Sequence, residues 1–175
     1  RVINYCLNTS DRGKVFKPRR HCKHEDIGQF EFIIEGYSDS NYAKGPVKRR
    51  SVSGYCSFME GCPLNTKSRM QPITALSVTE AELVAATECA QDLIYIKHVL
   101  ESIGLKVHTP MSLFIDNSGC IDLICNWSAG GRTRHMDTRM YFLRELKEEE
   151  PPIVMPIYCP TEVNRSDIFT KNCDT

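Results

Sequence analysis

A long helical pattern at residues 77–101 separates two groups of strand-like segments, and it constrains the fold more than any other stretch of the chain. Ser77 stands three residues before Glu80, the spacing of a capping box, which predicts that a helix starts here. At about 100° per residue, the apolar side chains fall on one side of this helix, which should end near Gly104. They are Ala86, Cys89, Ala90, Leu93 and Leu100.

Two carboxylates at the front of this helix point in different directions. Glu80 and Glu82 are about 200° apart, and the periodicity assigns Glu82 to the apolar side. It assigns the polar positions to solvent, namely Glu80, Thr87, Glu88, Gln91 and His98. An inward carboxylate costs several kcal/mol unless a partner compensates it. For Glu82 that partner is either the free backbone N–H groups of the first helical turn, aided by the helix dipole, or a functional group elsewhere.

Five further segments predict strands, because they are short, apolar or alternating, and bounded by turn residues. They are residues 30–37, 51–59, 64–70, 111–116 and 153–158. The first three should form an antiparallel meander, and residues 111–116 are typical of a strand buried on both faces. Additional helices are expected at residues 121–125, 137–150 and 164–171. The order β-β-β-α-β-α-α-β-α predicts an α/β fold with a mixed five-stranded sheet and helices against it.

The chain has 175 residues, of which 41% are hydrophobic, and this suits one compact domain. Residues 1–28 are mostly polar and lack periodicity, so we expect them to be an attached tail, with the domain covering residues 29–175. No apolar run of about 18 residues occurs and no signal pattern opens the chain. We therefore expect an intracellular protein with no membrane partner.

Cysteine usage and charge exclude two further classes of protein. Nine cysteines without a CxxC pair predict reduced, mostly buried thiols. His21, Cys22 and His24 lie close together, but no second ligand pair with zinc-finger spacing follows, which disfavours structural zinc. Twenty-two basic and twenty-two acidic residues cancel, which argues against a protein that binds nucleic acid by overall charge.

Basic residues nevertheless cluster locally. Each cluster either contacts phosphates or forms a solvated surface. The first consists of Lys44, Lys48, Arg49 and Arg50, followed by Lys67 and Arg69, and the second of Arg132, Arg134, Arg139 and Arg144.

Four acidic residues occupy positions from which they can converge. Asp39 ends the first strand, Asp116 ends the fourth, Glu82 points inward from the long helix, and Asp167 begins the last helix. In open α/β sheets, sites form beyond the carboxyl ends of strands. Taken singly, each acid is also explained as a turn residue or a helix cap. Crowded carboxylates repel one another, and a hard cation removes that conflict.

Oxygen ligands without His or Cys indicate Mg²⁺ or Mn²⁺ rather than Zn²⁺. Two such ions about 3.5–4 Å apart are the usual arrangement for attack on a phosphodiester. The four acids therefore predict a nuclease-type metal site.

Six motifs occur in an order that resembles the ribonuclease H domain of copia-type LTR retrotransposon polyproteins. They are Gly-Tyr-Ser-Asp-Ser-Asn-Tyr-Ala (36–43), Arg-Ser-Val-Ser-Gly-Tyr (50–55), Ser-Val-Thr-Glu-Ala-Glu (77–82), Phe-Ile-Asp-Asn (114–117), Arg-Thr-Arg-His-Met-Asp (132–137) and Asp-Ile-Phe-Thr-Lys (167–171). The resemblance covers the whole chain, and residues 1–18 are similar to the segment that links the reverse transcriptase to this domain.

The resemblance implies a ribonuclease H-like fold with strand order 3-2-1-4-5. It implies an Mg²⁺-dependent endonuclease that cuts the RNA strand of RNA–DNA hybrids during reverse transcription, with the reverse transcriptase domain as its partner. Asp39 would bridge both ions, Glu82 and Asp116 would hold the ion at the leaving group, and Asp167 the ion that activates water. The expected location is the cytoplasm, within a virus-like particle, with the nucleus as an alternative.

Hybrid recognition needs contacts to RNA 2′-hydroxyls and to DNA phosphates. The residues suited to the hydroxyls are Ser40, Asn41, Asn117 and Ser118, and those suited to the phosphates include Lys48, Arg49 and Arg50.

The chain departs from the family pattern in places. No His lies in the loop at residues 159–164, where many relatives carry one, and Asn41 stands where relatives are often acidic. His135 and Asp137 are expected to be structural or to contact substrate. Two alternatives stay open: a degenerate domain that binds nucleic acid or a protein without cleavage, and a spacer in a larger polyprotein.

Overall fold

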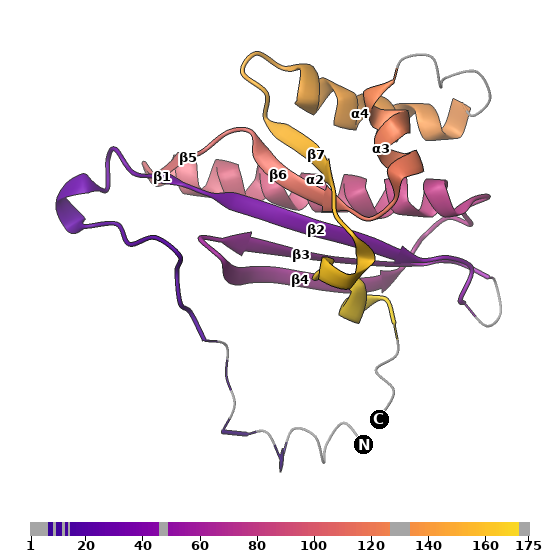
Figure 1. Ribbon diagram of the computed structural model, residues 1–175, viewed down its shortest axis with the longest axis horizontal. Helices are drawn as coiled ribbons and strands as arrows, with labels where there is room; N and C mark the ends of the chain where they lie inside the picture. Colours follow the sequence, from indigo (N-terminus) through magenta and orange to yellow (C-terminus); the bar gives the residue numbers. More distant parts are fainter. Residues whose placement is uncertain are drawn as a thin grey trace.

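A mixed five-stranded sheet forms the centre of the protein in this computed structural model, which describes residues 7–8, 10–11, 13, 15–45, 49–126 and 134–171. The strand order is β4-β3-β2-β6-β7, as Figure 1 shows. The strands are β2 (Ile34–Asn41), β3 (Val52–Met59), β4 (Cys62–Met70), β6 (Met111–Ile115) and β7 (Val154–Tyr158). The first three pair antiparallel, whereas β6 pairs parallel to both β2 and β7. The predicted meander, the mixed sheet and the 3-2-1-4-5 order are confirmed.

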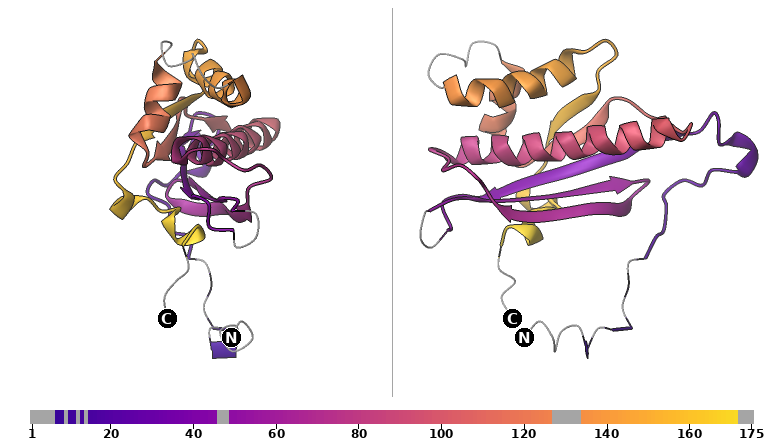
Figure 2. Two further views of the ribbon diagram at one scale, coloured as in Figure 1. Left: turned by 90° about the vertical axis from the view of Figure 1, so that its right-hand side faces the viewer. Right: turned by 180° about the vertical axis from the view of Figure 1, so that it is seen from behind.

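Helix α2 (Val78–Ser102) lies along one face of this sheet, packed against β2, β3 and β6 (Figure 2). Two shorter helices, α3 (Ser118–Cys125) and α4 (Arg134–Glu148), pack beside β7, and α4 also contacts α2. The core fills the space between these helices and the sheet. It includes Leu83, Leu93, Leu113, Ile115 and Leu143. Among the described residues, no helix is both long and apolar enough to cross a membrane.

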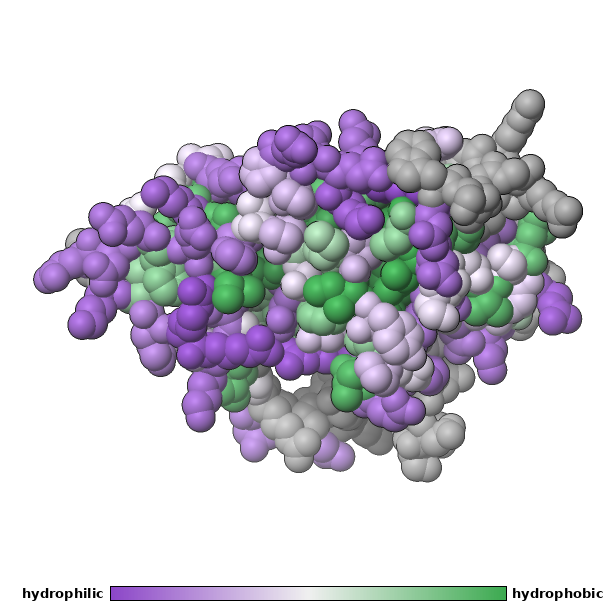
Figure 3. All heavy atoms as spheres, turned by 45° about the horizontal axis from the view of Figure 1, so that its top comes forward, coloured by the Kyte–Doolittle hydropathy of each residue, from purple (hydrophilic) through white to green (hydrophobic). Residues whose placement is uncertain are grey.

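The surface and the cysteines agree with a compact domain. On the face seen in Figure 3, hydrophilic side chains surround small apolar areas. The seven cysteines of the described residues are free, and five of them are buried: Cys56, Cys62, Cys89, Cys120 and Cys159. The prediction of reduced, mostly buried thiols is confirmed for this part of the chain.

The predicted first strand, residues 30–37, is divided in two. Its front part, β1 (Glu31–Phe32), pairs in parallel with β5 (Lys106–Val107) in a separate two-stranded sheet. The break is at Ile33, whose backbone N–H donates to Glu60 Oε1 at 2.8 Å and whose carbonyl accepts from Glu60 N at 3.0 Å. Arg20 Nε donates to the other Glu60 oxygen at 3.0 Å, which attaches the N-terminal segment to this corner.

Two polar positions of α2 are buried, not exposed, so the prediction for Glu80 and Thr87 is wrong. Because α4 covers a second side of α2, and Gln71 bonds the Ala81 carbonyl at 2.9 Å, the front of the helix is enclosed on more than one side. Glu80 is satisfied locally, since its side chain accepts from Leu76 N at 2.6 Å while its N–H donates to Ser77 Oγ at 3.1 Å. The predicted cap at Ser77 is thereby confirmed.

The final helix predicted at residues 164–171 is absent. The 3₁₀ turn η4 (Asp167–Phe169) occupies part of this region, and a second turn, η3 (Thr161–Val163), lies directly before it. Asn164 explains the difference, because its Nδ2 donates to the Ser38 carbonyl at 2.9 Å and its Oδ1 accepts from Ser166 N at 3.1 Å. Such side-chain bonds to the backbone compete with helical bonds. The segment therefore stays extended at Asn164 and packs against the sheet.

Arg144 does not belong to an exposed basic group, contrary to the sequence-based expectation. Its side chain is buried, with 2% of the residue exposed. It donates to the Ile124 carbonyl at 3.0 Å and to the Asn126 carbonyl at 2.6 Å, and also to the Leu123 carbonyl. Because the last carbonyls of a helix lack intrahelical partners, this arginine from α4 caps α3.

We predict that Arg144→Met lowers the free energy of unfolding by about 2–4 kcal/mol, because it leaves several buried carbonyls without a donor. Urea denaturation measures this change. Arg139→Met, on the same helix but half-buried, is the matched control and should change stability by less than about 0.5–1 kcal/mol. Equal stability of Arg144→Met and the wild type would contradict the capping role.

Candidate metal centre

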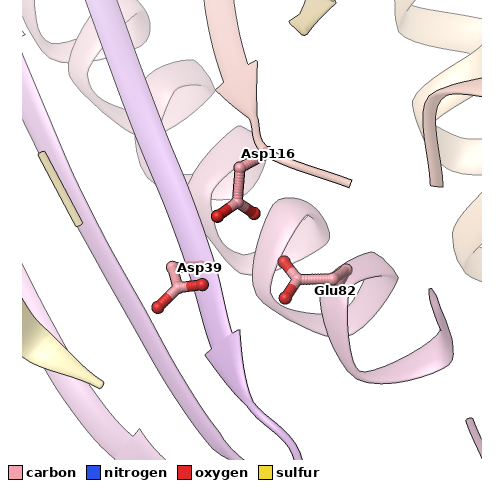
Figure 4. Close-up of side chains that lie close together, drawn as sticks. All are labelled: Asp39, Glu82 and Asp116. Atoms are coloured by element: carbon pink, nitrogen blue, oxygen red, sulfur yellow. The ribbon is translucent and has the colours of Figure 1, made fainter. Parts of the chain in front are cut away.

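Three acidic side chains come together where β2 and β6 end. One carboxylate oxygen from each of Asp39, Glu82 and Asp116 lies within 4.8 Å of the other two (Figure 4). Strands β2 and β6 pair in parallel with Ser38 opposite Ile115, so the next residues, Asp39 near the end of β2 and Asp116 directly after β6, lie at the same edge. Glu82 reaches them from α2. The predicted convergence of these three acids is observed.

Glu82 is almost fully buried, with 3% exposed, and only half satisfied. Its Oε1 accepts from the backbone N–H of Ser40 at 3.1 Å and from the Ser40 hydroxyl at 2.8 Å. Its Oε2 is buried and has no hydrogen-bond partner within the described part of the chain. Burial raises the pKa of Glu82 to about 8, the Ser40 hydroxyl opposes the rise, and the charges of Asp39 and Asp116 add to it.

Asp39 is also buried, and its Oδ2 accepts a hydrogen bond from the Thr170 hydroxyl. Burial raises the pKa of Asp39 above its usual range. The Thr170 hydrogen bond opposes this rise, whereas the nearby charges of Asp116 and Asp167 add to it. Like charges held in a desolvated place have this effect on carboxyl groups.

The other two acids are more accessible. Asp116 is half-buried and its Oδ2 accepts from the Thr161 hydroxyl at 3.1 Å. Asp167 begins η4 and forms an ion pair with Lys171. Within the part of the chain that the structure describes, Asp167 does not share the three-residue cluster. The structure thus brings together three of the four predicted ligands and leaves the fourth on the adjoining turn.

The donor set suits a hard divalent cation. All three residues offer carboxylate oxygens, which are the ligands that Mg²⁺ and Mn²⁺ prefer. Among the described residues, no hydrogen bond offsets the desolvation of the buried Oε2 of Glu82. A cation at this place would satisfy that oxygen and screen the repulsion among the three acids.

Several residues predicted to contact substrate already have structural partners. Ser40 bonds Glu82, Asn41 Nδ2 donates to the Thr170 carbonyl at 2.9 Å, and Asn117 caps α3 by accepting from Cys120 N at 2.8 Å. Ser118 is exposed at the start of α3. Contacts of these side chains with substrate stay a prediction.

The basic residues are only partly described. Arg49 is exposed and Arg50 is half-buried, whereas Arg69 is paired with Glu88 at 2.6 Å. Lys48 and Arg132 lie outside the described residues, and so do the side chains of His135 and Asp137.

Sequence reasoning missed Ser40 as a partner of Glu82 and Thr170 as a partner of Asp39. Each of the two residues lies in a motif that also contains a predicted ligand. Ser40 directly follows Asp39, and Thr170 comes three residues after Asp167. That proximity is the only available signal, and it does not say which carboxylate each hydroxyl would meet.

The raised pKa of Glu82 predicts an unusual pH dependence of stability in metal-free protein. Between the ordinary value of 4.5 and about 8, the folded chain binds more protons at Glu82 than the unfolded chain does. The free energy of unfolding should therefore fall as pH rises through this window, by at most about 1.4 kcal/mol per pH unit from this group. Denaturation with a chelator present, from pH 5 to 8, measures the slope.

Glu82→Gln should flatten that slope, because the amide does not titrate. Glu162→Gln, which changes an exposed carboxylate, should leave it as in the wild type. An identical slope in Glu82→Gln and the wild type would show that another group causes the dependence.

Comparison with known sequences relates this chain to a family of proteins. No family model matches the chain. Over 145 residues, or 83% of its length, the chain is 34% identical to the retrovirus-related Pol polyprotein from transposon TNT 1-94 of Nicotiana tabacum. Over 171 residues, or 98% of its length, it is 23% identical to the corresponding polyprotein from transposon RE2 of Arabidopsis thaliana. The chain spans 11% of each of these relatives.

A shorter match is to a protein that is not named as a polyprotein. Over 96 residues, the chain is 31% identical to secreted RxLR effector protein 161 of Plasmopara viticola, covering 55% of this chain and 61% of that protein.

Solved structures agree on the fold. LC11-RNase H1, isolated from compost by a metagenomic approach, superposes with a TM-score of 0.55 at 18% identity, covering 78% of this chain and 91% of that one. RNase H1 from Halobacterium salinarum gives a TM-score of 0.50 at 13% identity, covering 76% and 89%. LC11-RNase H1 in complex with an RNA/DNA hybrid also gives 0.50, at 15% identity and with 75% and 88% covered. Together with the sequence relatives, these structures show that the chain is a ribonuclease H-like domain of the copia-type retrotransposon Pol polyprotein family.

Proposed function

We propose that this domain is an endonuclease that hydrolyses the RNA strand of RNA–DNA hybrids by a two-metal-ion mechanism. The observation that carries the proposal is the convergence of Asp39, Glu82 and Asp116, together with a buried Glu82 oxygen that has no hydrogen-bond partner among the described residues. The fold and the Pol polyprotein relatives support it, and a ribonuclease H1 of similar fold has been seen in complex with an RNA/DNA hybrid.

The chain's own residues would divide the work as the family resemblance implies. Asp39, whose carboxylate meets both the α2 side and the η4 side of the site, would contact both cations. Glu82 and Asp116 would hold the cation near the leaving oxygen. Asp167, whose charge acts on Asp39, would complete the set on the water side. Two Mg²⁺ ions, or Mn²⁺, bound there supply Lewis acids that activate water and stabilise the leaving oxygen.

Substrate contacts would come from the rim of this site. Ser118 is exposed beside Asp116, and Ser40, Asn41 and Asn117 lie next to the acids in the chain, so these side chains suit RNA 2′-hydroxyls. Lys48, Arg49 and Arg50, between β2 and β3, suit backbone phosphates.

Membership of the Pol polyprotein family also suggests which domain this one is linked to and where it acts. We propose that residues 1–28 link it to a reverse transcriptase domain of one polyprotein, and that it acts inside the cell, during reverse transcription.

A second function, binding without cleavage, has one specific observation in its favour. Part of the chain resembles a protein named as a secreted effector rather than as a polyprotein. Binding of a hybrid with no cleavage in Mg²⁺ or Mn²⁺ would favour this second function.

Asp39→Asn should abolish Mg²⁺-dependent cleavage of a hybrid duplex. The neutral amide keeps the shape of the side chain but removes a charged ligand, and we expect kcat to fall by more than the roughly 100-fold that losing an outer-shell partner costs. A gel assay with a labelled RNA strand measures this. Asp122→Asn, which alters an exposed carboxylate on α3, is the matched control and should cleave normally. Unchanged cleavage by Asp39→Asn would refute the metal-site assignment.

A further inference from the structure

We propose that Thr170 is a positioning residue of the metal centre: its hydroxyl, presented by the η4 turn, holds the Asp39 carboxylate in the orientation that binds a divalent cation. This inference rests on the proposed function, because it assigns Thr170 a role toward a cation held by Asp39. It adds to the four acids a neutral residue that touches one of them.

The hydroxyl of Thr170 has a definite acceptor. Thr170 is buried, with 8% exposed, and its Oγ1 lies within hydrogen-bond distance of Asp39 Oδ2 and, at 3.1 Å, of the Asp167 carbonyl. A hydroxyl has a single proton to donate. Bonds to a charged acceptor are shorter and stronger than bonds to a neutral one, so the proton goes to Asp39.

The turn that presents Thr170 is fixed independently of Asp39. Asn41 Nδ2, from the end of β2, donates to the Thr170 carbonyl at 2.9 Å. The Ser68 hydroxyl, from β4, donates to the carbonyl of Phe169. Figure 1 shows the turn lying across β2, β3 and β4. Because these bonds hold the backbone on both sides of the hydroxyl, Thr170 is a rigid support for Asp39.

Gly54 makes this close approach possible. It lies opposite Asp39 in the β2–β3 register. A Cβ atom at Gly54 would lie 2.6 Å from Thr170 Cγ2, closer than real Cβ atoms come, and 3.0 Å from Phe169 Cβ, tighter than most such contacts. The bare backbone at this position therefore lets η4 settle against the strand that carries Asp39.

Asp39 needs such a support. Its carboxylate lies close to Glu82 and Asp116, the charges of Asp116 and Asp167 act against its own, and among the described residues only Thr170 donates a side-chain hydrogen bond to it. Each carboxylate oxygen has two lone pairs, so accepting from Thr170 leaves room for a cation. Without the hydroxyl, the carboxylate is free to rotate away from its acidic neighbours, and the metal would lose its shared ligand.

The test compares Thr170→Val with Thr170→Ser in the full chain. Valine keeps the shape of threonine and removes the hydroxyl, whereas serine retains it. We expect Thr170→Val to weaken Mn²⁺ binding, measured by calorimetry, by at least about tenfold, the usual effect of losing an outer-shell partner. Thr170→Ser should restore most of the affinity. In cleavage assays, kcat should fall in Thr170→Val while KM for the hybrid stays unchanged.

Two further variants separate positioning from general damage. Thr87→Val also removes a buried hydroxyl, one that donates to the Leu83 carbonyl at 2.7 Å, and should bind Mn²⁺ like the wild type. Gly54→Ala keeps every polar group but pushes η4 away, so it should weaken Mn²⁺ binding as Thr170→Val does. It provides a second test if the valine variant does not fold.

The outcomes distinguish the two proposals. Wild-type Mn²⁺ affinity in Thr170→Val, or an equal loss in Thr170→Val and Thr87→Val, would overturn the positioning role alone. Absence of Mn²⁺ binding in the wild type would overturn the proposed function and this inference with it.

Discussion

The crowding of three carboxyl groups, with one oxygen of each within 4.8 Å of the other two, is the constraint on which the metal centre depends. Two of them, Asp39 and Glu82, are buried as well, so desolvation adds to the repulsion and raises the pKa of both. The chain offsets part of this cost with the hydrogen bonds from Ser40 and Thr170. The desolvation of the other Glu82 oxygen, which has no hydrogen-bond partner among the described residues, is not offset. This uncompensated cost is the reason for assigning a cation to the site.

The pairing of the strands and the path of α2 bring the three acids together. Parallel pairing of β2 with β6 brings Asp39 and Asp116 to one edge, and α2 crosses over the sheet so that Glu82 reaches the same edge. Bonds that attach α2 to the sheet keep it there. Ser57 on β3 donates to Asp92 at 2.7 Å, and Arg69 on β4 is bound to Glu88. The helix that carries one ligand is thus attached to β3 and β4, in the same sheet as the strands that position the other two.

The C-terminal segment closes the opposite side of the site with short turns instead of a helix. Asn164 diverts the backbone by bonding Ser38, directly before Asp39, and the turn η4 then brings Thr170, at its end, to Asp39 and leaves Asp167 beside the cluster. A turn of three residues has few internal bonds, so its position depends on contacts with the sheet, especially at Gly54. This dependence connects a glycine in β3 to the orientation of a carboxylate in β2.

The sequence by itself determined most of the local elements and singled out the acids that the fold brings close together. Periodicity and the Ser77 cap placed α2 to within a residue or two, and alternation found the five strands of the main sheet, because these signals lie in consecutive residues. The sequence also singled out Glu82 over Glu80 as the inward acid. Glu80 bonds the backbone at the start of the helix, but it is buried and not exposed. Periodicity along one helix could not predict this burial, because it does not show what covers the second side of the helix.

Only the tertiary structure decided how distant residues meet. The pairing of Glu60 with Ile33, the burial of Arg144, and the contact of Thr170 with Asp39 join residues separated by 27, about 20 and 131 positions. No local pattern encodes such contacts, because they depend on how strands and helices pack. For the same reason, the sequence named four acids for one site, whereas the fold brought three together and left Asp167 paired with Lys171 on the turn beside them.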